Sequence, residues 1–159
     1  MIKKYQRTQN LISMDMLSDN TNMNADGVMY AYNGRVGTNT DIDVSNLNSV
    51  TVSVDLVGKT NTLYFIYAIF NGTTLINRVA GNLSGTSINT TNATNLRLCF
   101  YINNESIDKS NLSNLMLNEG STAKPYQPYY DWLAVPYKRY VNGEWVEYND
   151  QKYHNGSWD

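Results

Sequence analysis

Residues with catalytic potential are few in this sequence. The chain holds one histidine, His154, beside a turn motif, and one cysteine, Cys99, inside an apolar run. These unrelated contexts argue against a Cys–His nucleophile pair and against a zinc site. Loop positions suffice to explain the carboxylates Asp55, Glu105 and Asp108, so a glycosidase pair is not indicated. We therefore expect no catalytic residues and a protein that is not an enzyme.

Aromatic, arginine and asparagine side chains indicate a different chemistry, the binding of sugars. Aromatic rings stack on the C–H faces of sugars, while amide and guanidinium groups fix the hydroxyls. We expect seven such residues on one sheet face, with Arg35 and Arg78 at strand ends nearby. The candidate ligand-binding residues are Tyr30, Tyr32, Arg35, Tyr64, Phe70, Arg78, Arg97, Tyr101 and Asn103. An alternative stays open: Tyr64 and Phe70 also suit a core, and Tyr30 and Tyr32 also suit a subunit interface.

Residues 14–26 are polar, alternate poorly and are expected to form a loop. Oxygen-bearing side chains crowd this segment: Asp15, Asp19, Asn20, Asn22, Asn24 and Asp26. Such ligands suit a structural Ca²⁺, but their spacing is not that of an EF-hand loop. Because Asn and Asp are also common in plain turns, a metal-free loop is the favoured interpretation, and no other cofactor is expected.

The composition favours β structure in a weakly charged protein. The 159 residues fit one domain with an appendage, and only 16% of them are charged, against roughly 25% in average soluble proteins. The 23 Asn and 13 Tyr favour turns and strands over helix interiors. A net charge of −2 offers no basic face for nucleic acid. No stretch approaches the ~20 apolar residues of a membrane span, so neither nucleic acid nor membrane is an expected partner.

Alternating and apolar runs predict about eight strands, after a short first strand at residues 11–12. The expected strands are residues 28–36, 41–44, 50–57, 62–70, 75–80, 83–88, 93–103 and 112–119. Asn33-Gly34 predicts a hairpin turn or a kink, and Asn71-Gly72 predicts a hairpin. In residues 96–102, Leu96, Leu98 and Phe100 should point inward. This cadence predicts a two-sheet β-sandwich, but it does not separate an immunoglobulin-like sandwich from a jelly roll.

The last segment contains a repeat. Residues 140–145, Tyr-Val-Asn-Gly-Glu-Trp, recur in related form as residues 153–158, Tyr-His-Asn-Gly-Ser-Trp. Two-residue Asn-Gly turns would place Tyr140 opposite Trp145 and Tyr153 opposite Trp158. The segment is therefore expected to form two small β-hairpins.

A short signature marks the exit from the predicted sandwich. It consists of a strand end and two Pro-Tyr pairs, with the residues Leu117, Glu119, Gly120, Ser121, Thr122, Ala123, Pro125, Tyr126, Pro128 and Tyr129. This signature resembles the exit of the jelly-roll, carbohydrate-binding-module-like domains of bacteriophage tail and baseplate proteins. The chain is expected to divide into an N-terminal arm at residues 1–9, a domain at 10–128 that the resemblance identifies as a jelly roll, and a C-terminal hairpin appendage at 129–159.

The resemblance also implies a setting and a function. We expect a bacteriophage virion structural protein, of the tail, baseplate or decoration type, that binds saccharide on the host cell surface. Its expected partners are other virion proteins, host polysaccharide and further copies of itself, and its expected location is the virion, after synthesis in the host cytoplasm. Two alternatives remain: a purely architectural virion component without a ligand, and a carbohydrate-binding module of a bacterial surface protein.

Overall fold

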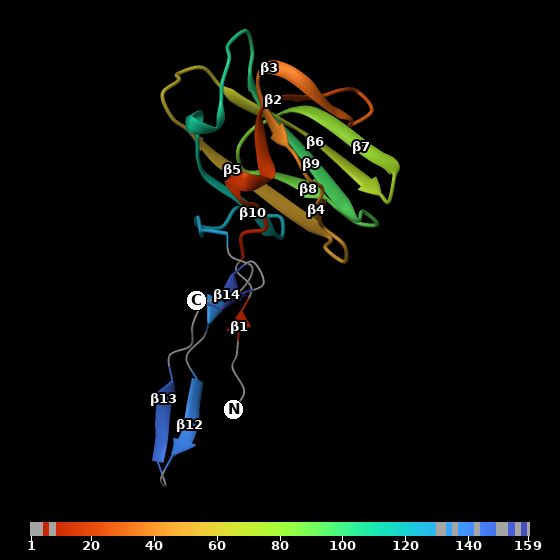
Figure 1. Ribbon diagram of the computed structural model, residues 1–159. Helices are drawn as coiled ribbons and strands as arrows, with labels where there is room; N and C mark the ends of the chain where they lie inside the picture. The colour runs from red at the N-terminus through yellow and green to blue at the C-terminus, as the bar shows by residue number, and fades with distance from the viewer. Residues whose placement is uncertain are drawn as a thin grey trace.

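Two antiparallel sheets form the body of the protein (Figure 1). The structure, a computed structural model, describes residues 9–129 throughout and, outside them, only the strands β1 and β11 to β15. The large sheet has the order β2–β3–β9–β6–β7, with β4 also paired to β9, and the small sheet has the order β10–β5–β8. The predicted all-β sandwich is confirmed.

The strands β3 to β10 match the predicted runs, whereas β2 lies in the segment predicted to be a loop. The large sheet contains β2 (Leu17–Met23), β3 (Met29–Thr38), β4 (Ile42–Asp43), β6 (Leu63–Asn71), β7 (Thr74–Asn82) and β9 (Asn95–Ile102). The small sheet contains β5 (Ser49–Leu56), β8 (Thr86–Asn89) and β10 (Leu112–Glu119). Two short 3-10 helices, η1 (Met14–Met16) and η2 (Lys109–Asn111), precede β2 and β10.

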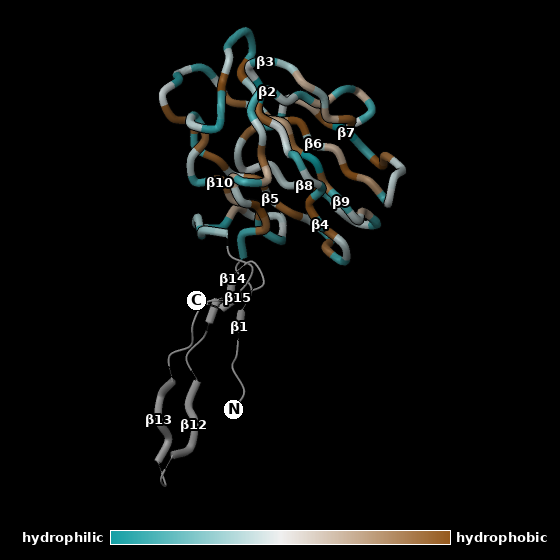
Figure 2. The backbone as a smooth tube through the Cα atoms, in the orientation of Figure 1, coloured by the Kyte–Doolittle hydropathy of each residue, from teal (hydrophilic) through white to brown (hydrophobic). Residues whose placement is uncertain are grey.

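The main core lies between the two sheets. Leu96, Leu98 and Phe100 of β9 all point into it, as predicted, and are fully buried. Val50 and Val52 of β5 meet them from the small sheet. Hydrophobic stretches accordingly follow the strands, whereas hydrophilic stretches concentrate in the connections (Figure 2).

A second, smaller apolar cluster covers the outer face of the large sheet. It contains Met23, Ile66, Ala68, Phe70, Cys99 and Tyr101, with Met29, Tyr64 and Leu75 packed against it. Met23 and Met29 belong to the far end of the β2–β3 hairpin, which folds back over β9 and β6. We call this far end, residues 21–31, the flap. The predicted loop at residues 14–26 was therefore wrong, because most of it forms η1 and the strand β2.

The flap bends away from the sheet at a large bulge. Asp19 pairs with Val36 and Thr21 pairs with Ala31, so Asn20 stands opposite the four residues 32–35. Asn20 (φ 53°) and Gly34 (φ 93°) both have left-handed backbones, and the Gly34 N–H donates to Asn20 Oδ1 at 3.2 Å. The Asn33-Gly34 signal therefore marks a kink, and the hairpin turn itself lies at residues 24–28, where Asn24 N–H donates to Val28 O.

The two ends of the sandwich chain meet at Asn10. Its buried side chain donates to Leu115 O and Gln127 O, and its Oδ1 accepts from Leu117 N and Ile12 N. These side-chain bonds substitute for a regular ladder beside β10. Residues 11–12 are consequently not a strand, contrary to the prediction.

Outside residues 9–129 the described strands form three small antiparallel pairs. They are β1 (Tyr5–Gln6) with β11 (Leu133–Ala134), β12 (Tyr137–Val141) with β13 (Glu144–Tyr148), and β14 (Tyr153–His154) with β15 (Ser157–Trp158). Tyr140 pairs with Trp145, and Tyr153 pairs with Trp158. Both predicted hairpin registers are confirmed.

Candidate functional site

Three of the candidate arginines hold the flap on the sheet. Arg35 Nη1 donates to Asn22 Oδ1 at 3.0 Å, and Arg78 Nη2 donates to Met23 O at 3.2 Å. Arg97 Nη1 donates to Gly27 O at 2.9 Å. The three come from β3, β7 and β9, so the flap is bound from three strands. The predicted placement of Arg35 and Arg78 at strand ends was wrong, because both lie inside strands.

Phe70 lies beneath the flap and is only 5% exposed. A Cβ atom built on Gly27, at the flap tip, would lie 2.7 Å from Phe70 Cζ, so the tip packs closely on this ring. The Arg97 Cζ atom lies 4.4 Å from the ring centroid, within the range of a cation–π contact. In the described structure Phe70 is thus a core residue of the second cluster and presents no open platform.

Cys99 is also covered by the flap and is fully buried. Burial raises the pKa of its thiol to about 11, although the positive charges of Arg35 and Arg78 and a backbone hydrogen bond from Met23 act in the opposite direction. Its Sγ atom lies 3.5 Å from Asn22 Oδ1. Burial agrees with the position of Cys99 in an apolar run of the sequence, and the raised pKa leaves the thiol a poor nucleophile at neutral pH.

Five candidate residues form a continuous line of ring contacts along the edge of the flap. We call this line the tyrosine ladder; in order, it consists of Tyr30, Tyr32, Arg35, Tyr101 and Tyr64. Ring centroids lie 6.1 Å apart for Tyr30 and Tyr32, and 5.7 Å apart for the stacked Tyr101 and Tyr64. Arg35 Cζ joins the two pairs, at 5.7 Å from the Tyr32 centroid and 4.4 Å from that of Tyr101.

The ladder is exposed at the Tyr30–Tyr32 end, buried in its middle and half-buried at Tyr64. Tyr30 and Tyr32 are 43% and 50% exposed, whereas Tyr101 is 8% exposed. Tyr64, half-buried, lines an open hollow of about 580 Å³ together with Asn103 and the neighbouring Asn61 and Glu105. The exposed rings and amides that can meet a ligand therefore lie at the two ends of the ladder.

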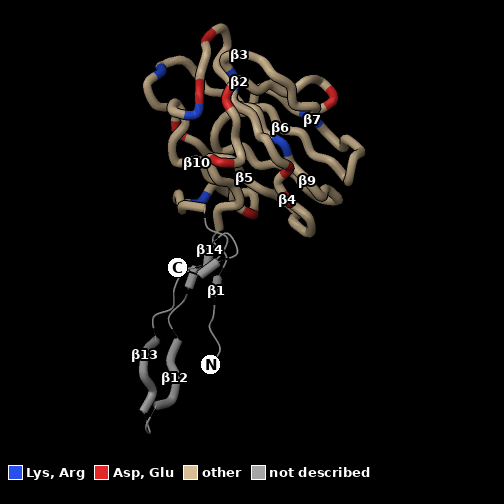
Figure 3. Tube along the Cα trace, viewed as in Figure 1, with Lys and Arg blue, Asp and Glu red and all other residues tan. Residues whose placement is uncertain are grey.

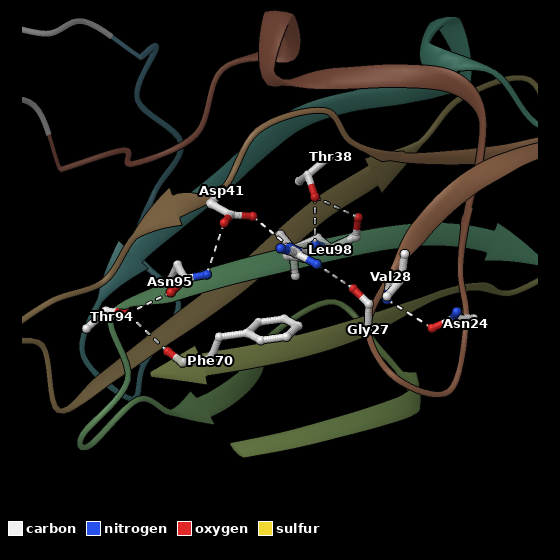
Figure 4. A network of polar contacts seen from close by, with 10 residues as sticks. Asn24, Gly27, Val28, Thr38, Asp41, Phe70, Thr94, Asn95 and Leu98 are labelled. Atoms are coloured by element: carbon white, nitrogen blue, oxygen red, sulfur yellow. Dashed lines mark hydrogen bonds and ion pairs between the residues drawn. The ribbon is translucent and has the colours of Figure 1, made fainter. Parts of the chain in front are cut away.

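A second open hollow, of about 510 Å³, lies beside the flap. Tyr30 and Arg97 line it, and so do Asp41 and Asn39, which the sequence did not single out. Asp41 Oδ1 accepts from Arg97 Nε at 2.7 Å, and Asp41 Oδ2 accepts from Asn95 Nδ2 at 3.0 Å (Figure 4). Asp41 belongs to no recognisable sequence motif. It gains its partners only because the loop before β4 packs against β9.

The carboxylates near the central strands have structural partners. Asp55 accepts from Asn114, and Glu105 pairs with Lys59 and accepts from Asn61. The Asp108 side chain accepts from the backbone and hydroxyl of Ser110, which lowers its pKa. Each of these groups serves to fix a loop or a strand end.

The segment considered for calcium is a strand and a turn. Asn20 and Asp19 bind backbone N–H groups of Gly34 and Lys109, and Asn24 Oδ1 accepts from Asp26 N and Val28 N. Within the described residues there is no group of three or more His, Cys, Asp or Glu placed to hold a metal ion. The amides of this segment build the bulge and the flap turn.

Comparisons with known proteins found no match: no family model, no curated protein and no solved structure is significantly similar to this chain. Among the residues that the structure describes, no helix has the length and apolar character needed to cross a membrane.

Proposed function

We propose that this chain is a structural protein of a bacteriophage particle whose sandwich, a jelly roll, binds saccharide on the surface of the bacterial host. The observation that supports this proposal most directly is the tyrosine ladder. Tyr30 and Tyr32 at one end, and Tyr64 with Asn103 at the other, combine exposed ring surface with hydrogen-bonding amides. This combination is what a sugar requires, because its ring offers C–H faces for stacking and hydroxyls at its rim.

The electrostatics of the described surface fit a weakly charged ligand. Acidic and basic residues are sparse and interspersed along the trace of residues 9–129 (Figure 3). Arg35, the one cation within the ladder, is engaged by Asn22 and by two tyrosine rings. A polysaccharide would therefore be held by stacking and short-range hydrogen bonds, with little dependence on salt.

A purely architectural role is the second candidate, and the meeting of the two chain ends favours it. Asn10 joins the N-terminal segment to Gln127, and Tyr126 beside them is 48% exposed. This exposed tyrosine lies where the N-terminal and C-terminal segments leave the sandwich, a position that suits docking on a neighbouring particle protein. In this case the ladder would pack against another subunit and would bind no sugar.

Binding to purified bacterial cell-wall polysaccharides of different sugar composition separates these roles. We expect the full chain to bind at least one of them, and Tyr32→Ala to weaken binding about 2- to 10-fold, the effect of one aromatic stacking contact. Tyr126→Ala is the matched control, because Tyr126 is as exposed as Tyr32 but lies off the ladder. Equal loss in both variants would mean that the ladder is not the binding site. No binding of any polysaccharide by the full chain would contradict the saccharide proposal and favour the architectural role.

A further inference from the structure

The hollow beside the flap is open and large enough to receive a small ring. Its walls come from β2, the first residues of β3 and the loop at residues 38–41, and Arg97 reaches it from β9. Its volume of about 510 Å³ lies within the usual range of small-molecule sites. The flap forms one wall of the hollow, and the three arginines hold the flap in this position.

Arg97 and Asp41 offer paired donors and acceptors at this hollow. A guanidinium group carries five N–H donors, and those of Arg97 make two hydrogen bonds, to Asp41 Oδ1 and Gly27 O. Three N–H groups therefore have no partner among residues 9–129. Each Asp41 oxygen accepts one bond and can accept another, and this side chain is 45% exposed. The two groups are fixed by each other, so their free positions are pre-organised.

The remaining surface of the hollow is mainly apolar. Val28, which precedes β3, and Met29, Tyr30 and Ala31 at its start line the hollow, and Val28 is 50% exposed. The Arg97–Asp41 ion pair brings no net charge, so an anion would gain no net attraction there. A ligand with an apolar face and adjacent hydroxyls, one donating to the carboxylate and one accepting from the guanidinium, matches all these features.

We infer that this hollow is a subsite for one neutral sugar residue, held by adjacent hydroxyls on Asp41 and Arg97. The inference rests on the proposed function and extends it. Tyr30 lines the hollow and also begins the tyrosine ladder. One glycan chain can therefore place a sugar in the hollow and continue over Tyr32. The hollow would then recognise one sugar residue, and the ladder would bind the following part of the glycan.

The test is a titration of the ¹⁵N-labelled full chain, followed by NMR. The probes are methyl glucoside, methyl galactoside, methyl mannoside and methyl glucuronide, each raised to tens of millimolar. We expect a neutral glycoside to shift the Arg97 Nε–H signal and the amides of residues 28–31, with a dissociation constant in the millimolar range. The amides of Tyr64 and Asn103 report separately on the far end of the ladder.

Two variants connect the signals to the hollow. Ala31→Trp places a large ring in the hollow and should abolish the shifts, whereas Thr73→Trp, at the exposed β6–β7 turn, should leave them unchanged. Asp41→Asn retains an acceptor for Arg97 but loses the charge, and should weaken binding about 10-fold. Alkylation of Cys99 in each variant shows whether the flap is still closed, which separates a lost contact from a displaced wall.

The outcomes distinguish the two proposals. Shifts at Arg97 that Ala31→Trp removes would support the subsite. Shifts confined to Tyr64 and Asn103, or produced by the glucuronide alone, would overturn the subsite and leave saccharide binding in place. Polysaccharide binding that is unchanged in Ala31→Trp and Asp41→Asn would likewise overturn the subsite and leave saccharide binding in place. Absence of binding by every glycoside and every polysaccharide would overturn both.

Discussion

The two faces of the large sheet are both buried, but by different means. On the inner face, Phe65 of β6 and Phe100 of β9 pack against the small sheet in a core that extends across the whole sandwich. On the outer face, Ile66 and Cys99 of the same strands pack under a flap of about ten residues. The inner cover is another sheet, whereas the outer cover is one end of a hairpin.

The two covers therefore differ in how much of their stability comes from apolar burial and how much from hydrogen bonds. The inner core gains the free energy of many fully buried side chains. The outer cluster is small, and hydrogen bonds from Arg35, Arg78 and Arg97 hold its cover. Opening the flap would break those three bonds and expose one cluster, while leaving the main core intact. We therefore expect the flap to open at a lower free energy than the sandwich unfolds.

The largest effect should follow from damage to the inner face. Phe100→Ala removes a fully buried ring that packs on Phe65, and should lower the free energy of unfolding by about 3–5 kcal/mol. Chemical denaturation measures this change. Ile76→Ala, at an exposed site on β7, should change stability by less than about 0.5 kcal/mol. Comparable losses in the two variants would contradict the position of the main core.

The thiol of Cys99 reports on the outer cover. Its pKa is raised from 9.0 to about 11 by burial, so at pH 8 its thiolate fraction is about 100-fold lower than that of an ordinary thiol. Iodoacetamide should therefore alkylate the folded chain at least about 100-fold more slowly than the urea-unfolded chain, as measured by mass spectrometry. Because the folded state holds this proton more tightly, stability should also fall as the pH rises from 9 to 11. Rapid alkylation of the folded chain would show that the flap is open.

A pair of glycines tests the contact between flap and sheet. Gly27 (φ 78°) and Gly81 (φ 77°) have the same backbone conformation, but only Gly27 has neighbours in the way of a Cβ atom. Gly81→Ala should cost about 1 kcal/mol of backbone strain. Gly27→Ala should cost about 1–3 kcal/mol more, because its Cβ meets Phe70, and it should also accelerate alkylation of Cys99. Equal costs, with unchanged alkylation, would mean that the flap tip does not pack on the sheet.

The smallest effect on stability should come from Asp108, which lies in the segment that contacts the bulge at the base of the flap. Its carboxylate accepts from Ser110, and the next residue, Lys109, donates its backbone N–H to Asp19 beside the bulge. The pKa of Asp108 is lowered from 3.8, so its contribution is present above pH 3.8 and is lost as the pH falls through the lower folded value. Asp108→Asn should slightly lower the melting temperature at pH 7 and leave it unchanged at the acid end. A variant as stable as the parent at pH 7 would contradict this role.

Much of the sandwich was predictable because its signals are local. Alternation in β9 predicted which of its side chains point inward, and the runs at residues 50–57 and 62–70 predicted strands. The Asn-Gly turns of the last segment fixed both hairpin registers. Residues 14–26 were mispredicted because a strand made of polar residues has no hydrophobic period, and its burial comes from the flap contacts.

The sequence predicted several residues of the candidate site but not how the structure arranges them. Alternation correctly gathered Tyr64, Arg97 and Tyr101 on one sheet face. For Phe70 the alternative of a core position is confirmed, because the flap covers its ring. Asp41 was missed because its partner Arg97 is 56 residues away. A pairing of that separation leaves no mark in either local sequence.

By itself, the sequence determined the strands, their inward faces and the terminal hairpins, since side-chain alternation and turn-forming residues act over a few positions. Only the tertiary structure decided which face the flap covers, which tyrosines stay exposed, and that Asp41 and Arg97 share a hollow. These features depend on a bulge at Asn20 and on arginines from distant strands. Hydrogen bonds between segments far apart in the chain form only after the sheets have assembled, so local patterns do not encode them.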